Sequence, residues 1–273
     1  DEFSPTAAAT ADQTTGMNDT ITGTVGGVGG TLQAADFMDG GGGTDAATFD
    51  LSGNFGGFSG DGGMTSVEMI TLTNSTMFNR TFDASGVSGV TGWVLNHTDG
   101  SISLSDLADL NATFTLNDLA DGNISLEWAA GALTGSSDSL SLFLNDVGSA
   151  STVDVQFTAG IESLSIDATG TNAISMSENT PTSMSISGSG TLEITEASSA
   201  LESMNASSFS GDLTADLSDV NAGNSLSSIQ SGNGDDFVSV HSSGLGVAAS
   251  VNMGGGSNDQ FEFMTGGGTF QPT

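Results

Sequence analysis

The feature that most constrains the fold is a repeat of twenty residues between positions 161 and 220. Its three rows open with Ile161-Glu-Ser-Leu-Ser-Ile, Pro181-Thr-Ser-Met-Ser-Ile and Leu201-Glu-Ser-Met-Asn-Ala. Apolar and small polar residues alternate in each row, which is the periodicity of a strand with one buried face. Second apolar segments follow at 174–176, 192–194 and 213–217. Because no row can bury its apolar face alone, the repeat predicts an all-β chain, a parallel β-helix or β-solenoid with rows of about 20 residues and Gly-rich turns.

The balance of charge restricts the partners of the chain. It carries 33 acidic residues and a single basic residue, Arg80, so the formal net charge is −32. Without a cationic patch it has nothing to neutralise phosphates, which excludes nucleic acid and disfavours an anionic membrane surface. Self-repulsion of this size destabilises a compact chain. We therefore expect bound divalent cations to relieve it, with simple solubility as the alternative role of most individual acids.

Several classes of site and segment are missing from the sequence. There is no Cys, which removes disulfides and thiolate chemistry, and the two His, at 97 and 241, lie far apart in sequence. No apolar run approaches the ~20 residues of a membrane span, and no signal-peptide pattern opens the chain. Because the chain begins at Asp1 without Met, we expect a processed, secreted, extracellular protein that does not insert into a membrane.

Three segments are distinguished along the chain. Residues 1–15 are small and polar, lack periodicity and predict a flexible N-terminal arm. Residues 16–135 form a β-rich N-terminal half, and residues 136–273 form a C-terminal β-solenoid half, with one continuous domain as the alternative. Strands are expected at 67–72, 124–128, 139–144 and 152–157.

A local duplication interrupts the strand pattern. Residues 105–110 read Ser-Asp-Leu-Ala-Asp-Leu, and residues 117–122 read Asn-Asp-Leu-Ala-Asp-Gly. Ser and Asn are good N-caps. Each copy is therefore expected to form a helical turn at the edge of a strand.

Three glycine-rich stretches approach the calcium nonapeptide G-G-x-G-x-D-x-U-x, in which U is a large apolar residue. They start at Gly40, Ser231 and Gly254, and they place Asp45, Asp236 and Asp259 at the Asp position. Glycines turn carbonyl groups inwards, and Asp adds a hard anionic oxygen of the kind Ca²⁺ prefers. Each stretch departs from the pattern at one position, and Asp236 and Asp259 are 23 residues apart, too far for a continuous calcium roll. Isolated Ca²⁺ sites are expected, with ion-free Gly/Asn/Asp turns as the alternative.

Catalytic constellations are weak. The acid pairs Glu193/Glu196 and Asp106/Asp109 have the composition of a glycosidase pair, but a chain rich in Ser and Asp also offers such pairs as solvated edges. No G-x-S-x-G elbow frames a nucleophile. We expect no enzymatic activity.

Seven N-x-S/T sequons occur, and Ser and Thr are frequent enough for several to arise by chance. The one at Asn18 overlaps a glycine-Asp phrase. The possible glycosylation sites are Asn74, Asn79, Asn96, Asn111, Asn123 and Asn205.

The order of phrases along the chain resembles surface-layer (S-layer) proteins of the RTX, or hemolysin-type calcium-binding, kind. The phrases are Leu32-Gln-Ala-Ala-Asp-Phe-Met-Asp-Gly-Gly, Ser66-Val-Glu-Met-Ile-Thr-Leu and Phe82-Asp-Ala-Ser-Gly, followed later by Leu201-Glu-Ser-Met-Asn-Ala, Gly232-Asn-Gly-Asp-Asp-Phe-Val and Val251-Asn-Met-Gly-Gly-Gly. The resemblance implies a secreted β-solenoid that binds Ca²⁺ and coats a cell. It assigns the ligands Asp45, Asp236 and Asp259, and it adds Asp39 and Asp235.

These observations together lead to an expected function. We expect an extracellular structural protein that self-assembles into a surface layer, sheath or filament stabilised by calcium, because cations offset the acidic charge. The expected partners are further copies of the chain and cell-surface polysaccharide. The alternatives are a secreted β-helical adhesin or carbohydrate-binding protein, for which only Trp93 and Trp128 supply indole rings, and a polysaccharide-active enzyme.

Overall fold

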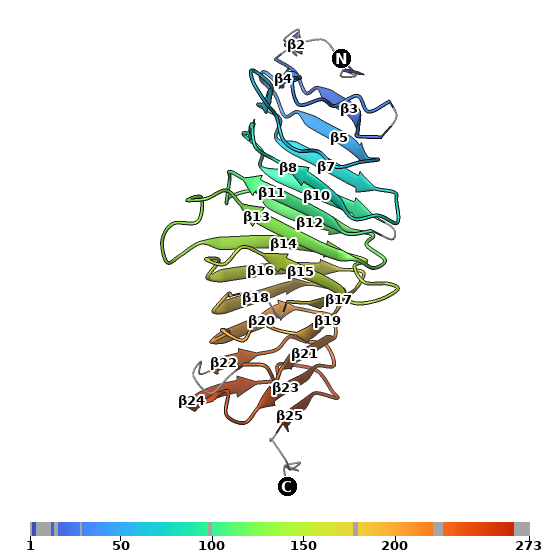
Figure 1. The fold of residues 1–273 in the computed structure, drawn as a ribbon. Helices are drawn as coiled ribbons and strands as arrows, with labels where there is room; N and C mark the ends of the chain where they lie inside the picture. The colour runs from blue at the N-terminus through green and yellow to red at the C-terminus, as the bar shows by residue number, and fades with distance from the viewer. Residues whose placement is uncertain are drawn as a thin grey trace. The chain divides into compact units, whose positions relative to one another are not determined.

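The computed structural model describes residues 2–3, 12–13, 16–27, 29–97, 100–176, 180–220 and 226–264. These ranges contain strands, turns and irregular segments but no helix, and therefore no helix long and apolar enough to cross a membrane. The chain divides into an N-terminal unit, Asp1–Thr134, and a C-terminal unit, Gly135–Thr273. Each unit is a β-solenoid whose successive strands pair in parallel (Figure 1). The predicted all-β solenoid is confirmed.

The N-terminal unit holds strands of three sheets. The first contains, in spatial order, β1 (Glu2–Phe3), β3 (Thr20–Val25), β5 (Ala46–Leu51), β7 (Met69–Asn74), β10 (Gly92–His97) and β12 (Thr113–Asn117). The second contains β8 (Arg80–Asp83), β11 (Ile102–Leu107) and β13 (Asn123–Trp128). The third contains β2 (Asp12–Gln13), β4 (Phe37–Asp39), β6 (Gly63–Thr65) and β9 (Val87–Ser88). Within the predicted arm, residues 1–15, the described strands β1 and β2 pair with β3 and β4.

The C-terminal unit holds two stacks of strands. The first contains β14 (Ser139–Asn145), β16 (Ser163–Thr169), β18 (Ser183–Gly188), β20 (Ser203–Phe209), β22 (Leu226–Gln230) and β24 (Leu245–Asn252). The second contains β15 (Val153–Phe157), β17 (Thr171–Ser175), β19 (Thr191–Glu196), β21 (Leu213–Leu217), β23 (Phe237–His241) and β25 (Gln260–Met264). Each complete turn of the chain, here called a coil, contributes one strand to each stack.

The twenty-residue repeat corresponds to the pairing register of β16, β18 and β20. Ser163 lies opposite Ser183, and Ser183 lies opposite Ser203, so each of these two coils advances the chain by 20 residues. The second apolar segment of each row forms β17, β19 or β21. Elsewhere the coils are longer, as where Thr20 lies opposite Ala46. Extra residues in those coils lie in turns, which hides the repeat in the rest of the sequence.

Columns of apolar side chains fill the interior of each unit. In the C-terminal unit, Leu164, Met184 and Met204 stack in successive coils, and all three are buried. In the N-terminal unit the buried ring of Phe82 packs against Phe49, Phe55 and Trp93 at centroid distances of 6.3, 4.9 and 6.0 Å. Because every row faces its neighbours, each coil is stabilised by burial against the next.

The helical turns expected at 105–110 and 117–122 are wrong. Residues 105–107 end strand β11, and Asp106 and Asp118 instead adopt left-handed backbone angles, with φ of 53° and 55°. Ser66 and Asp146 share this conformation, and the next residue is buried in all four cases: Val67, Leu107, Leu119 and Val147. Asp tolerates the left-handed region better than most residues. The duplicated phrase is therefore a corner that turns the chain and returns an apolar side chain to the core.

Candidate functional site

Asp45 is the predicted calcium ligand with the most unusual surroundings. It stands between Asp19 and Glu68, since these three acids directly precede the paired strands β3, β5 and β7. The Asp19 backbone N–H donates to Asp45 Oδ1 at 2.6 Å, and the Asp45 backbone N–H donates to Glu68 Oε2 at 2.7 Å. Each carboxylate thus receives the main-chain N–H of the acid one coil earlier.

One oxygen of Asp45 is left over. The residue is 1% exposed, and its Oδ2 atom is buried without a hydrogen-bond partner in the described structure. A Cβ placed on Gly40 would lie 2.8 Å from this oxygen and would clash with the Ser66 carbonyl oxygen. A buried carboxylate oxygen beside a carbonyl is an arrangement that a cation or a water molecule stabilises. Asp45 Oδ2 and the Ser66 carbonyl oxygen would supply two of the six or more oxygen ligands that Ca²⁺ takes.

Asp39 has a local structural role. Its Oδ1 atom accepts a hydrogen bond from the Gly41 backbone N–H at 3.0 Å, which makes a turn at the start of the glycine run. The side chain is half-buried. This contact holds the loop that leads to Asp45.

Asp236 is buried, and both of its oxygens are occupied. Oδ1 accepts the Leu213 backbone N–H, and Oδ2 accepts the Gly232 backbone N–H, both at 3.0 Å. In the next coil Asp259 repeats one of these bonds, since its Oδ1 accepts the Asp236 backbone N–H at 3.0 Å. The structure thus places Asp236 and Asp259, 23 residues apart, in adjacent coils, where each accepts main-chain donors.

Asp235 forms a parallel ladder on the exposed side of the same turns. Its backbone N–H donates to Asp212 Oδ1 at 2.9 Å, and its Oδ2 accepts Asn258 Nδ2 at 2.6 Å. Oδ1 accepts the backbone N–H groups of Ser257 and Asn258. These bonds, the one from the Asn258 side chain first, hold the pKa of Asp235 below its usual value.

The predicted ligands therefore fall into two groups. Asp39 and Asp45 share a turn of the N-terminal unit, and Asp235, Asp236 and Asp259 share two turns of the C-terminal unit. Within the described ranges, no three His, Cys, Asp or Glu side chains gather in a way that would hold a metal ion. Any cation bound at these turns would depend on one carboxylate with carbonyl groups, as the nonapeptide pattern implies.

The sequons differ in accessibility. Asn74 is buried, and its Nδ2 donates to the carbonyl oxygens of Phe78 and Ser101 at 2.9 and 3.2 Å. A glycan on that nitrogen is incompatible with these bonds. Asn96 is half-buried, with its Oδ1 atom buried and without a partner. The sequon asparagines whose side chains are exposed, and so accessible for glycosylation, are Asn18, Asn79, Asn111, Asn123 and Asn205.

The acid pairs considered for catalysis are surface residues. Glu193 and Glu196 are exposed on β19, where Glu196 accepts a hydrogen bond from Ser175 Oγ at 3.2 Å. Asp106 is the left-handed corner residue described above, and Asp109 is exposed two residues after β11.

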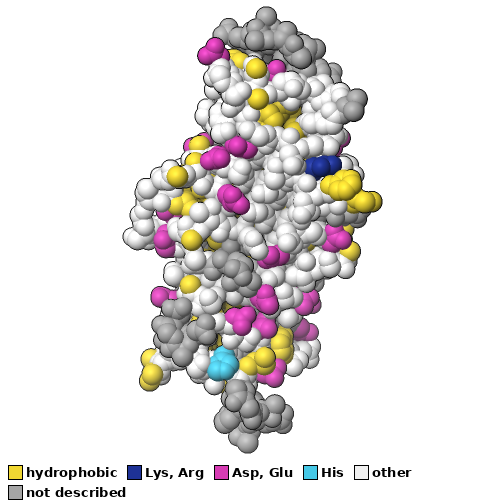
Figure 2. Space-filling model, in the orientation of Figure 1, with side chains coloured by type: hydrophobic (Ala, Val, Ile, Leu, Met, Phe, Trp, Pro, Cys, Tyr) yellow, Lys and Arg dark blue, Asp and Glu magenta, His cyan; other side chains and the backbone are white. Residues whose placement is uncertain are grey.

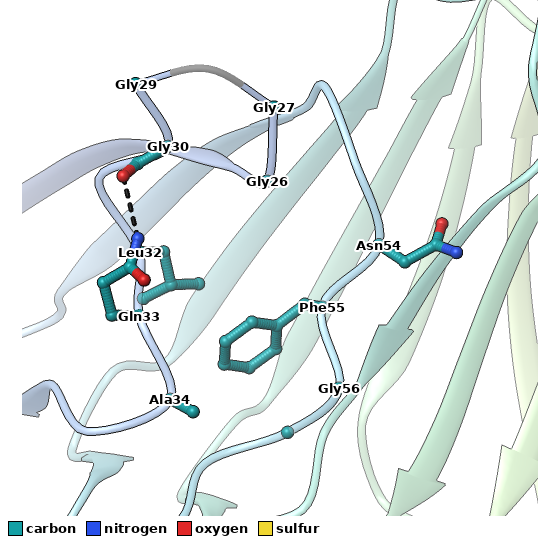
Figure 3. A pocket seen from close by; sticks show the side chains of 11 residues that line it. Gly26, Gly27, Gly29, Gly30, Leu32, Gln33, Ala34, Asn54, Phe55 and Gly56 are labelled. Carbon is teal, nitrogen blue, oxygen red and sulfur yellow. Dashed lines mark hydrogen bonds between the residues drawn. The ribbon is translucent and has the colours of Figure 1, made fainter.

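A cavity of about 500 Å³ was missed at the level of sequence. It lies in the N-terminal unit, between the turn of residues 26–34 and the turn of residues 54–57 (Figure 3). Its wall is mostly glycine backbone, with the Phe55 ring and the Gln33 side chain as its larger side chains, while the Asn54 side chain points away from the glycine turn and accepts the Thr81 backbone N–H at 3.2 Å. Gln33 Nε2 donates to the Gly30 carbonyl oxygen at 2.8 Å. The paired glycines are its sequence signal, because side chains there would fill the space.

The fold and these turns define the chain as a β-solenoid with carboxylate-capped turns. No protein-family model, curated protein sequence or solved structure matches it.

Proposed function

We propose that this chain is an extracellular structural protein, without enzymatic activity, that assembles with copies of itself into a surface layer, sheath or filament stabilised by calcium. The observation that carries the proposal is the last described coil, β24 and β25. Val251 stacks on buried Ile229 but is 38% exposed, and Phe261 stacks on buried Val238 but is half-buried. These positions are core in the preceding coils of the C-terminal unit, and they are partly exposed in the last described coil.

The strand edges support the same role. In the described part of the chain β24 and β25 are the last strands of their stacks, and no described strand pairs with their outer edges. Such edges are templates for another chain. In a parallel solenoid the two end edges are complementary, so contacts between copies are head-to-tail and produce open filaments instead of closed dimers.

Calcium enters the proposal through Asp45 and through the net charge. A polymer of chains with a formal charge of −32 accumulates strong repulsion. Ca²⁺ bound beside the buried Asp45 Oδ2 would neutralise part of it. The extracellular location rests on the resemblance to RTX-type surface-layer proteins.

The test is electron microscopy and sedimentation of the purified protein with Ca²⁺ and with chelator. We expect ordered polymers in Ca²⁺, and dispersal of the polymer or a lower melting temperature in chelator. An Asp45→Asn variant should show a smaller difference between the two conditions. Polymers indifferent to chelator would refute the calcium role alone, and the absence of polymers in every condition would refute the structural role.

A carbohydrate-binding adhesin is the second candidate, favoured by the cavity beside Phe55. An uncharged cavity with an aromatic ring and amide groups suits a neutral sugar. If this role is right, a glycan array should give a ligand whose affinity falls at least tenfold in Gly56→Leu, a change designed to fill the cavity. Phe143→Ser, an exposed substitution in the C-terminal unit, is the control and should leave the affinity unchanged.

A further inference from the structure

The loop of residues 75–79, between β7 and β8, presents the most exposed large apolar pair of the N-terminal unit. Met77 is 74% exposed and Phe78 is 62% exposed. Figure 2 shows a protruding hydrophobic group beside the one dark-blue side chain of that view, which is Arg80. The Arg80 guanidinium lies 5.4 Å from the centroid of the Phe78 ring. Exposed Phe, Met and Arg together have the composition of an interaction hot spot.

Hydrogen bonds from the side chains of Asn74 and Arg80 hold the loop in one conformation. The buried Asn74 side chain donates to the Phe78 carbonyl oxygen at 2.9 Å and accepts the Thr76 backbone N–H at 3.1 Å and the Thr76 hydroxyl at 2.8 Å. Arg80 Nε donates to the Leu51 carbonyl oxygen at 3.1 Å. Because the loop is already ordered, a partner that binds it loses little conformational entropy. The loop therefore holds the Met77 and Phe78 side chains in exposed positions before any partner binds.

Arg80 distinguishes this loop from every other surface of the chain. It is the single Lys or Arg among 273 residues that include 33 acids, and no acidic side chain in the described ranges pairs with it. Any contact between two copies brings acids close to acids unless a cation or Arg80 takes part. Arg80 is the one Lys or Arg with which a carboxylate of a second copy can pair.

The geometry points to a lateral contact between copies, in which the loop of residues 75–79 and the adjoining Arg80 dock on an acidic surface of a second copy of this chain. Phe78 and Met77 supply the apolar contact, and Arg80 pairs with a carboxylate of the neighbour. The inference rests on the self-assembly proposed above. It adds a second interface, distinct from the β24 and β25 edges, and that interface is independent of calcium.

The test compares wild type with Phe78→Ser, Met77→Ser and Arg80→Gln in chelator, where calcium bridges are removed. Sedimentation velocity should show association weakened about tenfold or more by Phe78→Ser and by Arg80→Gln. Phe143→Ser, which removes an exposed Phe from β14, should change association less than about twofold. Circular dichroism and melting curves verify the fold of each variant, and Met77→Ser covers the case in which loss of the Arg80 bond to Leu51 disturbs folding.

Salt gives an independent readout. The difference between wild type and Arg80→Gln should shrink as NaCl rises from ~10 mM to about 1 M, because screening removes the ion pair. If the variants associate as strongly as wild type, the inference is overturned and self-assembly still stands. Wild type that associates in Ca²⁺ but not in chelator overturns the calcium-independent contact and leaves self-assembly standing, and wild type that associates in neither condition overturns both. Loss of binding to an acidic polysaccharide such as alginate, with association intact, overturns the inference in favour of a glycan contact.

Discussion

Replacing Val251 and Phe261 together by Ser is expected to turn the polymer into monomers. In the proposed head-to-tail stack these side chains become core, as Ile229 and Val238 are in the coil below. Burying a Val and a Phe that are already partly covered contributes roughly 2–4 kcal/mol per interface. Association should therefore weaken by about 30- to 1,000-fold, measured by sedimentation velocity in Ca²⁺.

The matched control for this variant is Phe143→Ser, because Phe143 is 43% exposed on β14 and away from the last coil. It should leave head-to-tail association unchanged. The double variant should lower the monomer's melting temperature only modestly, because both side chains are partly exposed and Phe261 loses a single ring contact, that with Phe263. A polymer of undiminished stability would contradict the end-to-end interface. A lower melting temperature without loss of association would show that the chain's own residues cover these side chains.

Asp236→Ala is expected to destabilise the C-terminal unit by about 3 kcal/mol. The carboxylate accepts the main-chain N–H groups of Leu213 and Gly232. Hydrogen bonds to a charged group contribute roughly 1.5–3 kcal/mol each, and their loss leaves buried donors unpaired. Urea unfolding measures the change. Asp219→Ala, at an exposed position, is the control and should change stability by less than about 0.5 kcal/mol.

The same variant separates a structural carboxylate from a calcium ligand. If Asp236 stabilises the fold by accepting the Leu213 and Gly232 N–H groups, Asp236→Ala should lose the same stability in Ca²⁺ and in chelator. A loss seen in Ca²⁺ that disappears in chelator would identify Asp236 as a ligand instead. Asp236→Asn should be milder than Asp236→Ala, because one acceptor oxygen remains for Leu213 or Gly232.

The acidic turns show how far spacing can predict a site. The glycine-Asp phrases correctly marked positions where the chain turns and where coils meet, since Asp236 and Asp259 do stack across coils. Spacing does not report what an oxygen faces. Asp45 keeps an unpartnered buried oxygen while Asp236 has none, although both follow the same phrase. The difference lies in the second oxygen, because Gly232, four residues before Asp236 in the same turn, donates its backbone N–H to Asp236 Oδ2, and the turn before Asp45 supplies no such bond.

The corners and the sequons show the same limit. Asp106 and Asp118 looked like the start of helical turns, yet both are left-handed corners, because packing Leu107 and Leu119 into the core outweighs a weak local preference for helix. The sequon at Asn74 looks like the others in sequence. Only the fold shows that its amide holds the loop that carries Phe78.

The sequence by itself determined the class of fold and the coil length at 161–220. Alternation of period two assigns side chains to faces, and a fixed repeat brings equivalent side chains into register, so both are written directly in residue order. Only the tertiary structure decided which acids are buried, which oxygen is left over, which coil ends uncovered and where Arg80 lies. Those properties depend on contacts between residues about 20 to 29 apart, in coils whose length varies with their turns. No local sequence pattern predicts how coil length varies.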